Sequence, residues 1–384
     1  MQRLSVEELE PGMIVARTIL NSDGRPLLAQ NTTLTEHYIN RLKELGLTTV
    51  YVKNDLGDVE IPEVVSSSVR LAVTKSLKSS VQTIPAKGRL DTKSLKKSVG
   101  LLVDDIMSNR DVLFAMYDVC AHSDILLFHS INVCILAVMT GISLGYNELS
   151  LMELGVGALL HDIGMATIPP EILNKPGALT EAEAELVRKH PESGFNILRA
   201  QGDIPLRSSH IAFQHHERWD GSGYPRGMSG NDILEYARIV AVADVFEALA
   251  SDRPYREAYA INDIFTILRK LSGVYFDPDI LDVFISNIAP YPVGSMVKLN
   301  NGHVAVVLSV NKSHPHRPEV ACIVGTDGNL LVPAMKVDLS GERHLQIVKL
   351  LTGKEFKLLR TVLNQKVAGL QQNSFPSPSS TQKN

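Results

Sequence analysis

The stretch Val156-Gly157-Ala158-Leu159-Leu160-His161-Asp162-Ile163-Gly164 decides the fold, because an apolar run ends abruptly in a histidine and a carboxylate. The run has the composition of a core helix, so His161 and Asp162 stand at what should be its buried end. Polar groups that are buried without partners are strongly destabilising. The stretch therefore predicts a helical core whose polar end holds a metal ion or a dense hydrogen-bond network.

A second buried carboxylate is expected at Asp244. It lies inside the apolar run from Ile239 to Phe246, with no cation within one helical turn. Further histidines recur along the chain, about one ligand group per helix or helix hairpin, and side chains from facing helices of a bundle can converge on one point. The predicted metal ligands are His129, His161, Asp162, His190, His215, His216 and Asp244. A site for two divalent ions takes about six to eight protein ligands, which this set can supply.

The rest of the chain divides by pattern. Residues 111–290 are predicted to form an all-α bundle, with helices near 122–144, 150–161, 180–201, 204–215, 232–250 and 261–271. Residues 1–54 are expected to form a small α+β domain with one helix over Thr35 to Leu45 and strand-like pieces at Met13 to Leu20 and Thr48 to Val52. Residues 55–110 are Lys- and Ser-rich and are interpreted as a charged helical connector.

The C-terminal part changes to alternating β-type runs, such as Val304 to Leu308 and Val320 to Val324. Residues 291–372 are therefore predicted to be a small β-rich appendage. Residues 373–384 are mostly Ser, Pro, Gln and Thr, too polar to bury much surface, and are expected to form a disordered tail.

Charge and cysteine content limit the function classes. Among 384 residues, 38 Lys and Arg against 42 Asp and Glu give a net charge of −4, so we expect no DNA or RNA partner. Three cysteines without paired metal spacing fit a reducing compartment. No run of about 18 apolar residues is apparent, so no membrane segment is expected. We expect a soluble, cytoplasmic protein.

Several spaced motifs in one order resemble the HD-GYP subfamily of the HD superfamily of metal-dependent phosphohydrolases. The resemblance covers roughly residues 115–290. It rests on His161-Asp162-Ile163-Gly164, Ile168-Pro169, His190-Pro191, His215-His216-Glu217, Asp220-Gly221-Ser222-Gly223-Tyr224-Pro225 and Asp252-Arg253-Pro254-Tyr255-Arg256. It implies an HD-type helical bundle that hydrolyses the bacterial second messenger cyclic di-GMP to pGpG, in some members on to GMP.

The resemblance also assigns roles to residues. It implies two divalent ions, iron or manganese first and nickel, cobalt or zinc as alternatives, with His161 and Asp162 as catalytic residues and Asp162 as the bridge. Arg253 and Arg256 resemble residues that hold substrate phosphates, a task that suits Arg. Their alternative role is a surface ion pair with Asp252 or Glu257. The turn residues Gly223, Tyr224 and Pro225 would contact diguanylate-cyclase-type partner domains.

The sequence departs from the family pattern at two positions. Met165 follows His-Asp-Ile-Gly where Lys is common, and a thioether cannot neutralise a phosphate. This replacement predicts reduced turnover. Members with three ions carry an acid one helical turn before the first histidine, and here that position is Ile125. Asp124 is one residue off and His122 is unassigned, so we expect two ions and mainly pGpG.

The sequence leaves two other functions open. The protein could be a cyclic di-GMP sensor or partner-binding module with weak or no turnover, because Met165 replaces the Lys. It could also be an enzyme for a hybrid cyclic dinucleotide or another nucleotide, because the metal core does not itself choose a base. A homodimer is compatible with either reading.

Overall fold

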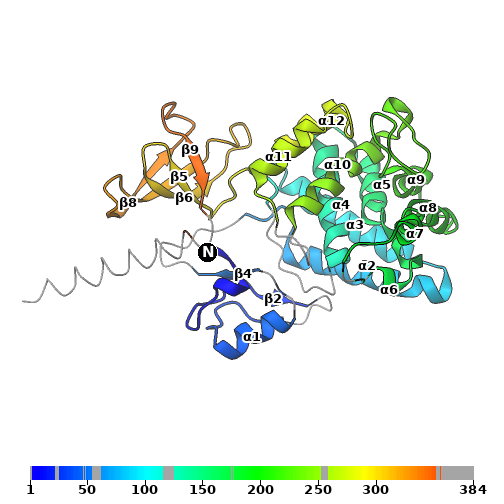
Figure 1. The fold of residues 1–384 in the computed structure, drawn as a ribbon, viewed down its shortest axis with the longest axis horizontal. Helices are drawn as coiled ribbons and strands as arrows, with labels where there is room; N and C mark the ends of the chain where they lie inside the picture. The colour runs from blue at the N-terminus through cyan, green and yellow to red at the C-terminus, as the bar shows by residue number, and fades with distance from the viewer. Residues whose placement is uncertain are drawn as a thin grey trace, which may run out of the picture.

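The computed structural model of the chain describes residues 2–21, 26–45, 47, 49–53, 62–115, 125–173, 175, 177–251, 258–351 and 355. Figure 1 shows a helical bundle with a small α+β part at the N-terminal end of the chain and a small antiparallel sheet near the C-terminal end. This is the mainly α architecture that the sequence predicts.

The N-terminal part contains two short sheets and one helix. Strand β1 (Gln2–Ser5) pairs antiparallel with β4 (Thr49–Val52), and β2 (Ile19–Leu20) pairs with β3 (Pro26–Leu28). Helix α1 (Glu36–Glu44) begins after Thr35, whose hydroxyl accepts a hydrogen bond from the Tyr38 amide. The strand-like piece expected at Met13 to Leu20 is not continuous: it contributes β2 and isolated bridges at Ile14 and Val15.

The segment predicted as a connector forms two long helices, α2 (Ser67–Lys87) and α3 (Thr92–Ser108). Their apolar faces are buried: Leu95, Val99 and Leu102 are fully covered and belong to the same hydrophobic cluster as the bundle. These helices therefore pack as part of the bundle core rather than as a solvated link.

The remaining helices of the bundle follow in close succession. They are α4 (Ile125–Ser143), α5 (Glu148–Leu159), the 3-10 helix η3 (Ile163–Thr167), α6 (Pro170–Leu173), α7 (Glu181–Val187), α8 (His190–Arg199), α9 (Leu206–Gln214), the 3-10 helix η4 (Gly230–Asp232), α10 (Glu235–Ala250), α11 (Ile261–Lys270) and α12 (Pro278–Ser286).

The helix predicted over residues 180–201 is two helices, which corrects the sequence-based expectation. Helix α7 ends at Val187, and α8 begins at His190 with Pro191 in its first turn. Proline lacks the backbone N–H that a continuing helix needs, but it is well tolerated at a helix start. The break matters because it places His190 at the first position of α8.

Two stretches, Leu126–Ser143 and Glu148–Thr167, are long and apolar enough by composition to cross a membrane, where the sequence reading expected none. However, 72% and 61% of these two stretches are buried inside the protein. Such burial is typical of the core helices of a bundle.

The C-terminal part is a five-stranded antiparallel sheet in the order β8-β7-β6-β5-β9. Its strands are β5 (Met296–Leu299), β6 (Val304–Ser309), β7 (Glu319–Val324), β8 (Leu330–Asp338) and β9 (Ile347–Leu350). The predicted tail, 373–384, lies outside the described residues, as does Cys120. Cys134 and Cys322 are buried free thiols.

Candidate metal centre

The seven predicted ligands come from the ends or middles of five segments of the bundle. His129 lies on α4 and Asp244 on α10. The other five stand where helices begin or end: His161 and Asp162 between α5 and η3, His190 at the start of α8, and His215 and His216 at the end of α9. The ends of several helices can lie close together even though their axes must stay apart. Ligands at helix ends can therefore reach one point.

Asp162 occupies the centre of this arrangement. Its Oδ1 atom lies 3.3 Å from Nε2 of His190 and 3.5 Å from Nε2 of His215. Its Oδ2 atom lies 3.5 Å from Nε2 of His161 and 3.9 Å from Nε2 of His129. The two oxygens of one carboxylate thus face two different sets of histidines.

These contacts separate the ligands into two groups. One consists of Asp162, His190, His215 and His216; the other consists of His129, His161 and Asp244. In each group the possible ligand atoms lie within 4.8 Å of one another. All seven predicted ligands are therefore brought together in the described structure, in two adjacent sets.

The imidazole rings are oriented by hydrogen bonds from the nitrogen that faces away from the cluster. The Nδ1 atoms of His161 and His190 each lie 2.8 Å from a backbone carbonyl, of Ala158 and Val187 respectively. His215 makes the same kind of contact with Ala212 at 3.0 Å. A carbonyl only accepts, so Nδ1 carries a proton and Nε2 of each ring faces the cluster, the orientation of metal-binding histidines.

His129 is oriented by a carboxylate that the sequence reading missed. Its Nδ1 atom lies 2.5 Å from Oε2 of the buried Glu247, while its Nε2 atom lies 3.1 Å from Oδ1 of Asp244. The second oxygen of Glu247 accepts hydrogen bonds from Asn132 and Ser251. Glu247 lies three residues after Asp244, on the same face of the helix, and that spacing could have indicated its role.

Burial and charge shift the pKa values of the histidines in opposite directions. Burial lowers the pKa of His161 to about 4 and that of His216 to about 3, so both are neutral at pH 7. Burial would also lower the pKa of His129, but the carboxylates of Glu247 and Asp244 outweigh it and raise the value to about 10.

The carboxylates are held ionised by the histidines. Burial would raise the pKa of Asp162, but His161, His190 and His215 hold it well below its usual range. The pKa of Asp244 is also lowered, chiefly by His129 against the effect of burial. Ionised carboxylates and neutral imidazoles are the ligand states that divalent transition metals require.

An unpaired nitrogen atom in the cluster is a further indication that these residues suit divalent metal ions. The Nε2 atom of His161 is buried and makes no hydrogen bond within the described residues. A buried imidazole nitrogen without a partner is costly, and a metal ion in the group with His129 and Asp244 would satisfy it. Partly exposed carboxylates and mostly buried imidazoles, one of them with an unpaired nitrogen, form a donor set that suits a metal centre.

The turn after α9 covers one side of the cluster. The ring of Tyr224 is stacked on His216, with centroids 4.8 Å apart and planes at 26°. The buried Glu217 accepts hydrogen bonds from the backbone amides of Arg226 and Met228, at 2.8 and 2.9 Å. Glu217 thus fixes the loop that holds Tyr224 over His216, a role that the sequence reading did not assign.

Close backbone packing fixes the position of His190 relative to Asp162. A Cβ atom on Gly164 would lie 2.0 Å from the His190 carbonyl oxygen and 2.6 Å from the Gly194 amide nitrogen. Only glycine allows η3 and α8 to approach this closely. Gly164, the glycine in His-Asp-Ile-Gly, therefore allows His190 to lie close to Asp162 in the cluster.

Some predicted residues cannot be placed. Arg253, Arg256, Asp124 and His122 lie outside the described residues. Met165 is described: it lies on η3, three residues after Asp162, and lines a pocket beside the cluster.

Two parts of the chain match known protein families. Residues 114–280 match a family described as HD domain, and residues 296–359 match one described as a KOW domain associated with HD domain. The first match contains every residue of the cluster, and the second contains the C-terminal sheet.

Named relatives are similar to the chain over part of its length. The chain is 32% identical over 250 residues, 65% of its length and 60% of the relative, to a cyclic di-GMP phosphodiesterase of Pseudomonas aeruginosa. It is 43% identical over 143 residues, 37% of its length and 39% of the relative, to a cyclic di-GMP phosphodiesterase of Thermotoga maritima. It is 37% identical over 191 residues, 49% of its length and 43% of the relative, to a 3'3'-cGAMP-specific phosphodiesterase of Vibrio cholerae.

The aligned region spans less than two thirds of each of these relatives. Within residues 114–280, which match the HD domain family, lie both signatures of the resemblance, the pair His161-Asp162 and the turn Gly223-Tyr224-Pro225. Residues 114–280 therefore belong to the HD domain family, and named relatives of the chain are cyclic dinucleotide phosphodiesterases.

Proposed function

We propose that the protein is a phosphodiesterase that hydrolyses cyclic di-GMP to linear pGpG at a site for two divalent metal ions. The observation that carries this proposal is the position of Asp162, whose two oxygens face two separate groups of histidines. A carboxylate placed in this way is suited to bridge two ions. The names of the relatives support cyclic di-GMP as the substrate.

Charge explains why ions are needed. Asp162, Asp244 and Glu247 bring three carboxylates to one small region. An anionic phosphodiester would be repelled there unless cations were bound. Held by these residues, divalent ions would supply the Lewis acidity that polarises a phosphoryl oxygen and activates water. Iron or manganese is our first choice, with nickel, cobalt or zinc as alternatives.

The protein's own residues determine where the substrate approaches. His161, His190 and His215 are fully buried, whereas the carboxylates of Asp162 and Asp244 are 17% and 16% exposed. The phosphodiester therefore reaches the cluster from the carboxylate side. Arg253 and Arg256 remain our proposed phosphate-binding residues, because Arg suits bidentate contact with phosphate.

We infer that the reaction stops mainly at pGpG. The acid that would help to hold a third ion is replaced by Ile125. The turn Gly223-Tyr224-Pro225 is our proposed contact for diguanylate-cyclase-type domains, and its Pro225 is exposed. A homodimer and a cytoplasmic location belong to the same proposal.

The second candidate function is a cyclic di-GMP sensor that turns over slowly or not at all. Met165 favours it, because a thioether cannot stabilise charge on the phosphate or on the leaving oxygen. Purified, metal-loaded protein should be incubated with cyclic di-GMP while pGpG and GMP are followed by chromatography. The phosphodiesterase proposal predicts accumulation of pGpG, and tight binding without any product would contradict it.

Substitution at Met165 separates the two candidates further. Met165→Lys should raise the turnover number about tenfold or more if the missing cation limits the reaction. Met165→Leu is the matched control, because it keeps an apolar side chain of similar size. An equal rate in both variants would show that the cation is not what limits turnover.

A further inference from the structure

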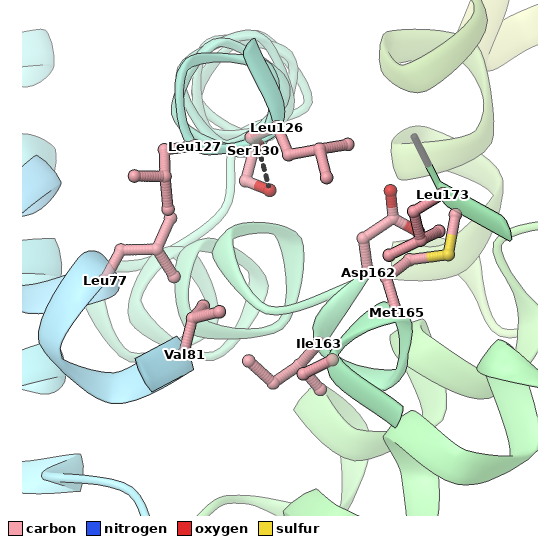
Figure 2. A pocket seen from close by; sticks show the side chains of 10 residues that line it. Leu77, Val81, Leu126, Leu127, Ser130, Asp162, Ile163, Met165 and Leu173 are labelled. Atoms are coloured by element: carbon pink, nitrogen blue, oxygen red, sulfur yellow. Dashed lines mark hydrogen bonds between the residues drawn. The ribbon is translucent and has the colours of Figure 1, made fainter. Parts of the chain in front are cut away.

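A pocket of about 140 Å³ adjoins the candidate metal centre, and Asp162 lines both. Figure 2 shows the side chains around it. Ten residues form the lining, and the polar ones are Asp162 and Ser130. Ser130 donates its hydroxyl hydrogen to the backbone carbonyl of Leu126, at 3.1 Å, so this group is already engaged. The pocket is therefore an apolar space with one edge at the metal ligands.

One wall of the pocket comes from outside the region that matches the HD domain. Leu77 and Val81 lie one helical turn apart on α2, and both face the pocket. The opposite wall is built by Ile163 and Met165 of η3. Helix α2 thus adds a surface that residues 114–280 alone do not provide.

Two leucines of the lining are exposed, so the pocket is open to solvent beside them. Leu126 on α4 is 48% exposed and Leu173 on α6 is 36% exposed, and both belong to the lining. An apolar cavity of about 150 Å³ accepts a benzene ring, whereas a pocket for a whole drug-sized ligand takes about 300–1,000 Å³. The size and the open mouth suit one flat ring system that belongs to a larger ligand.

We propose that this pocket is a nucleobase subsite, which receives one base of the substrate while the adjoining phosphodiester lies at Asp162. The inference rests on the proposed function, since it assumes a nucleotide at the metal centre. Apolar side chains commonly hold the faces of a base in such pockets. Met165 gains a role here, because an unbranched, polarisable thioether adapts to a flat ring.

The lining also determines which bases the pocket accepts. With the Ser130 hydroxyl engaged and Asp162 directed at the histidines, the pocket walls offer no spare donor or acceptor that reads the edge of a base. The subsite therefore accepts a flat ring by its shape and takes guanine and adenine alike.

The test compares three ligands that share a ribose and a phosphate: GMP and AMP carry a base, and ribose 5-phosphate carries none. Calorimetry with metal-loaded, full-length protein should give a dissociation constant for GMP about tenfold lower than that for ribose 5-phosphate, and AMP should bind within about threefold of GMP. Val81→Phe fills the pocket and should bring GMP and ribose 5-phosphate to within about twofold. The control is Ser79→Phe, which adds the same ring on the same helix at an exposed position.

Ala166→Leu fills the pocket from the η3 side and replaces Val81→Phe if that variant does not fold. Equal dissociation constants for GMP and ribose 5-phosphate in the unmodified protein would overturn the inference. So would a folded, pocket-filling variant that still prefers GMP. Failure of the proposed function is a different result, namely no pGpG from cyclic di-GMP, and it leaves the ratio of the two dissociation constants unaffected.

Discussion

Glu247 holds His129 in the orientation that the metal centre needs: its Oε2 atom lies 2.5 Å from Nδ1 of His129, and Nε2 of the same ring faces Asp244. Outer carboxylates of this kind orient a histidine and raise its basicity as a ligand. Both residues are buried, so solvent does not weaken the interaction.

We expect Glu247→Gln to lower metal affinity about 10- to 100-fold, since removal of such an outer partner has an effect of that size. Metal titration followed by calorimetry measures the change. Glu192→Gln, an exposed position on α8, is the matched control and should leave affinity unaltered. An unchanged affinity in a folded Glu247→Gln protein would show that Glu247 does not act on the metal centre.

Metal binding should release a proton from His129. In the metal-free protein its pKa is raised from 6.5 to about 10, so the ring is charged at pH 7 and must lose the Nε2 proton to bind a metal. Affinity should therefore rise with pH up to about 10. The charged ring stabilises the metal-free fold fully below pH 6.5, and this stabilisation is lost as the pH rises through about 10.

Calorimetry in buffers with different ionisation enthalpies detects the proton. His161 and His216, with pKa values of about 4 and 3, release none at pH 7 and give the contrast. A binding enthalpy that is independent of the buffer would contradict the charged state of His129.

Asp162→Asn should lower metal content and abolish hydrolysis while the helices remain folded. The carboxylate contacts both ligand groups, and an amide presents only one, uncharged, oxygen to them. Elemental analysis, circular dichroism and product analysis measure the three quantities. Hydrolysis at the unmodified rate would exclude a bridging role for Asp162.

Tyr224→Ala should lower affinity for the metal ion that His216 helps to hold, by about tenfold, because the ring stacked on His216 is lost. Tyr224→Phe keeps the ring and should retain the affinity of the unmodified protein. Metal stoichiometry by elemental analysis distinguishes the variants. The stacking interaction is irrelevant to metal binding if both variants hold two ions equally well.

Gly164→Ala should destabilise the protein by about 1–3 kcal/mol or more, because the new methyl group meets the backbone of His190 and Gly194. Gly100→Ala is the control: it lies inside α3, and its nearest contacts are side-chain atoms of Met152 at 3.9 Å. Removing a helical glycine there should stabilise by up to about 1 kcal/mol. Thermal unfolding followed by circular dichroism gives both values.

Sequence reasoning found three ligands of the candidate site because they violate a local rule, and it found the four other histidines from their recurrence along the chain, about one ligand group per helix or helix hairpin. His161, Asp162 and Asp244 are polar residues at positions where the surrounding pattern demands burial. The same reasoning missed Glu247 and Glu217, whose neighbours in sequence gave no comparable contradiction. It also treated α2 and α3 as a connector, since their many Lys and Ser residues concealed the buried faces of these helices.

The sequence by itself determined the bundle, the C-terminal sheet and the residue types of a metal centre, because periodicity and burial are local properties of the chain. The tertiary structure alone decided that Asp162 faces two groups of histidines, that Glu247 orients His129, and that α2 forms a wall of the pocket beside them. Such contacts join residues far apart in the chain, and their distances depend on how the helices pack.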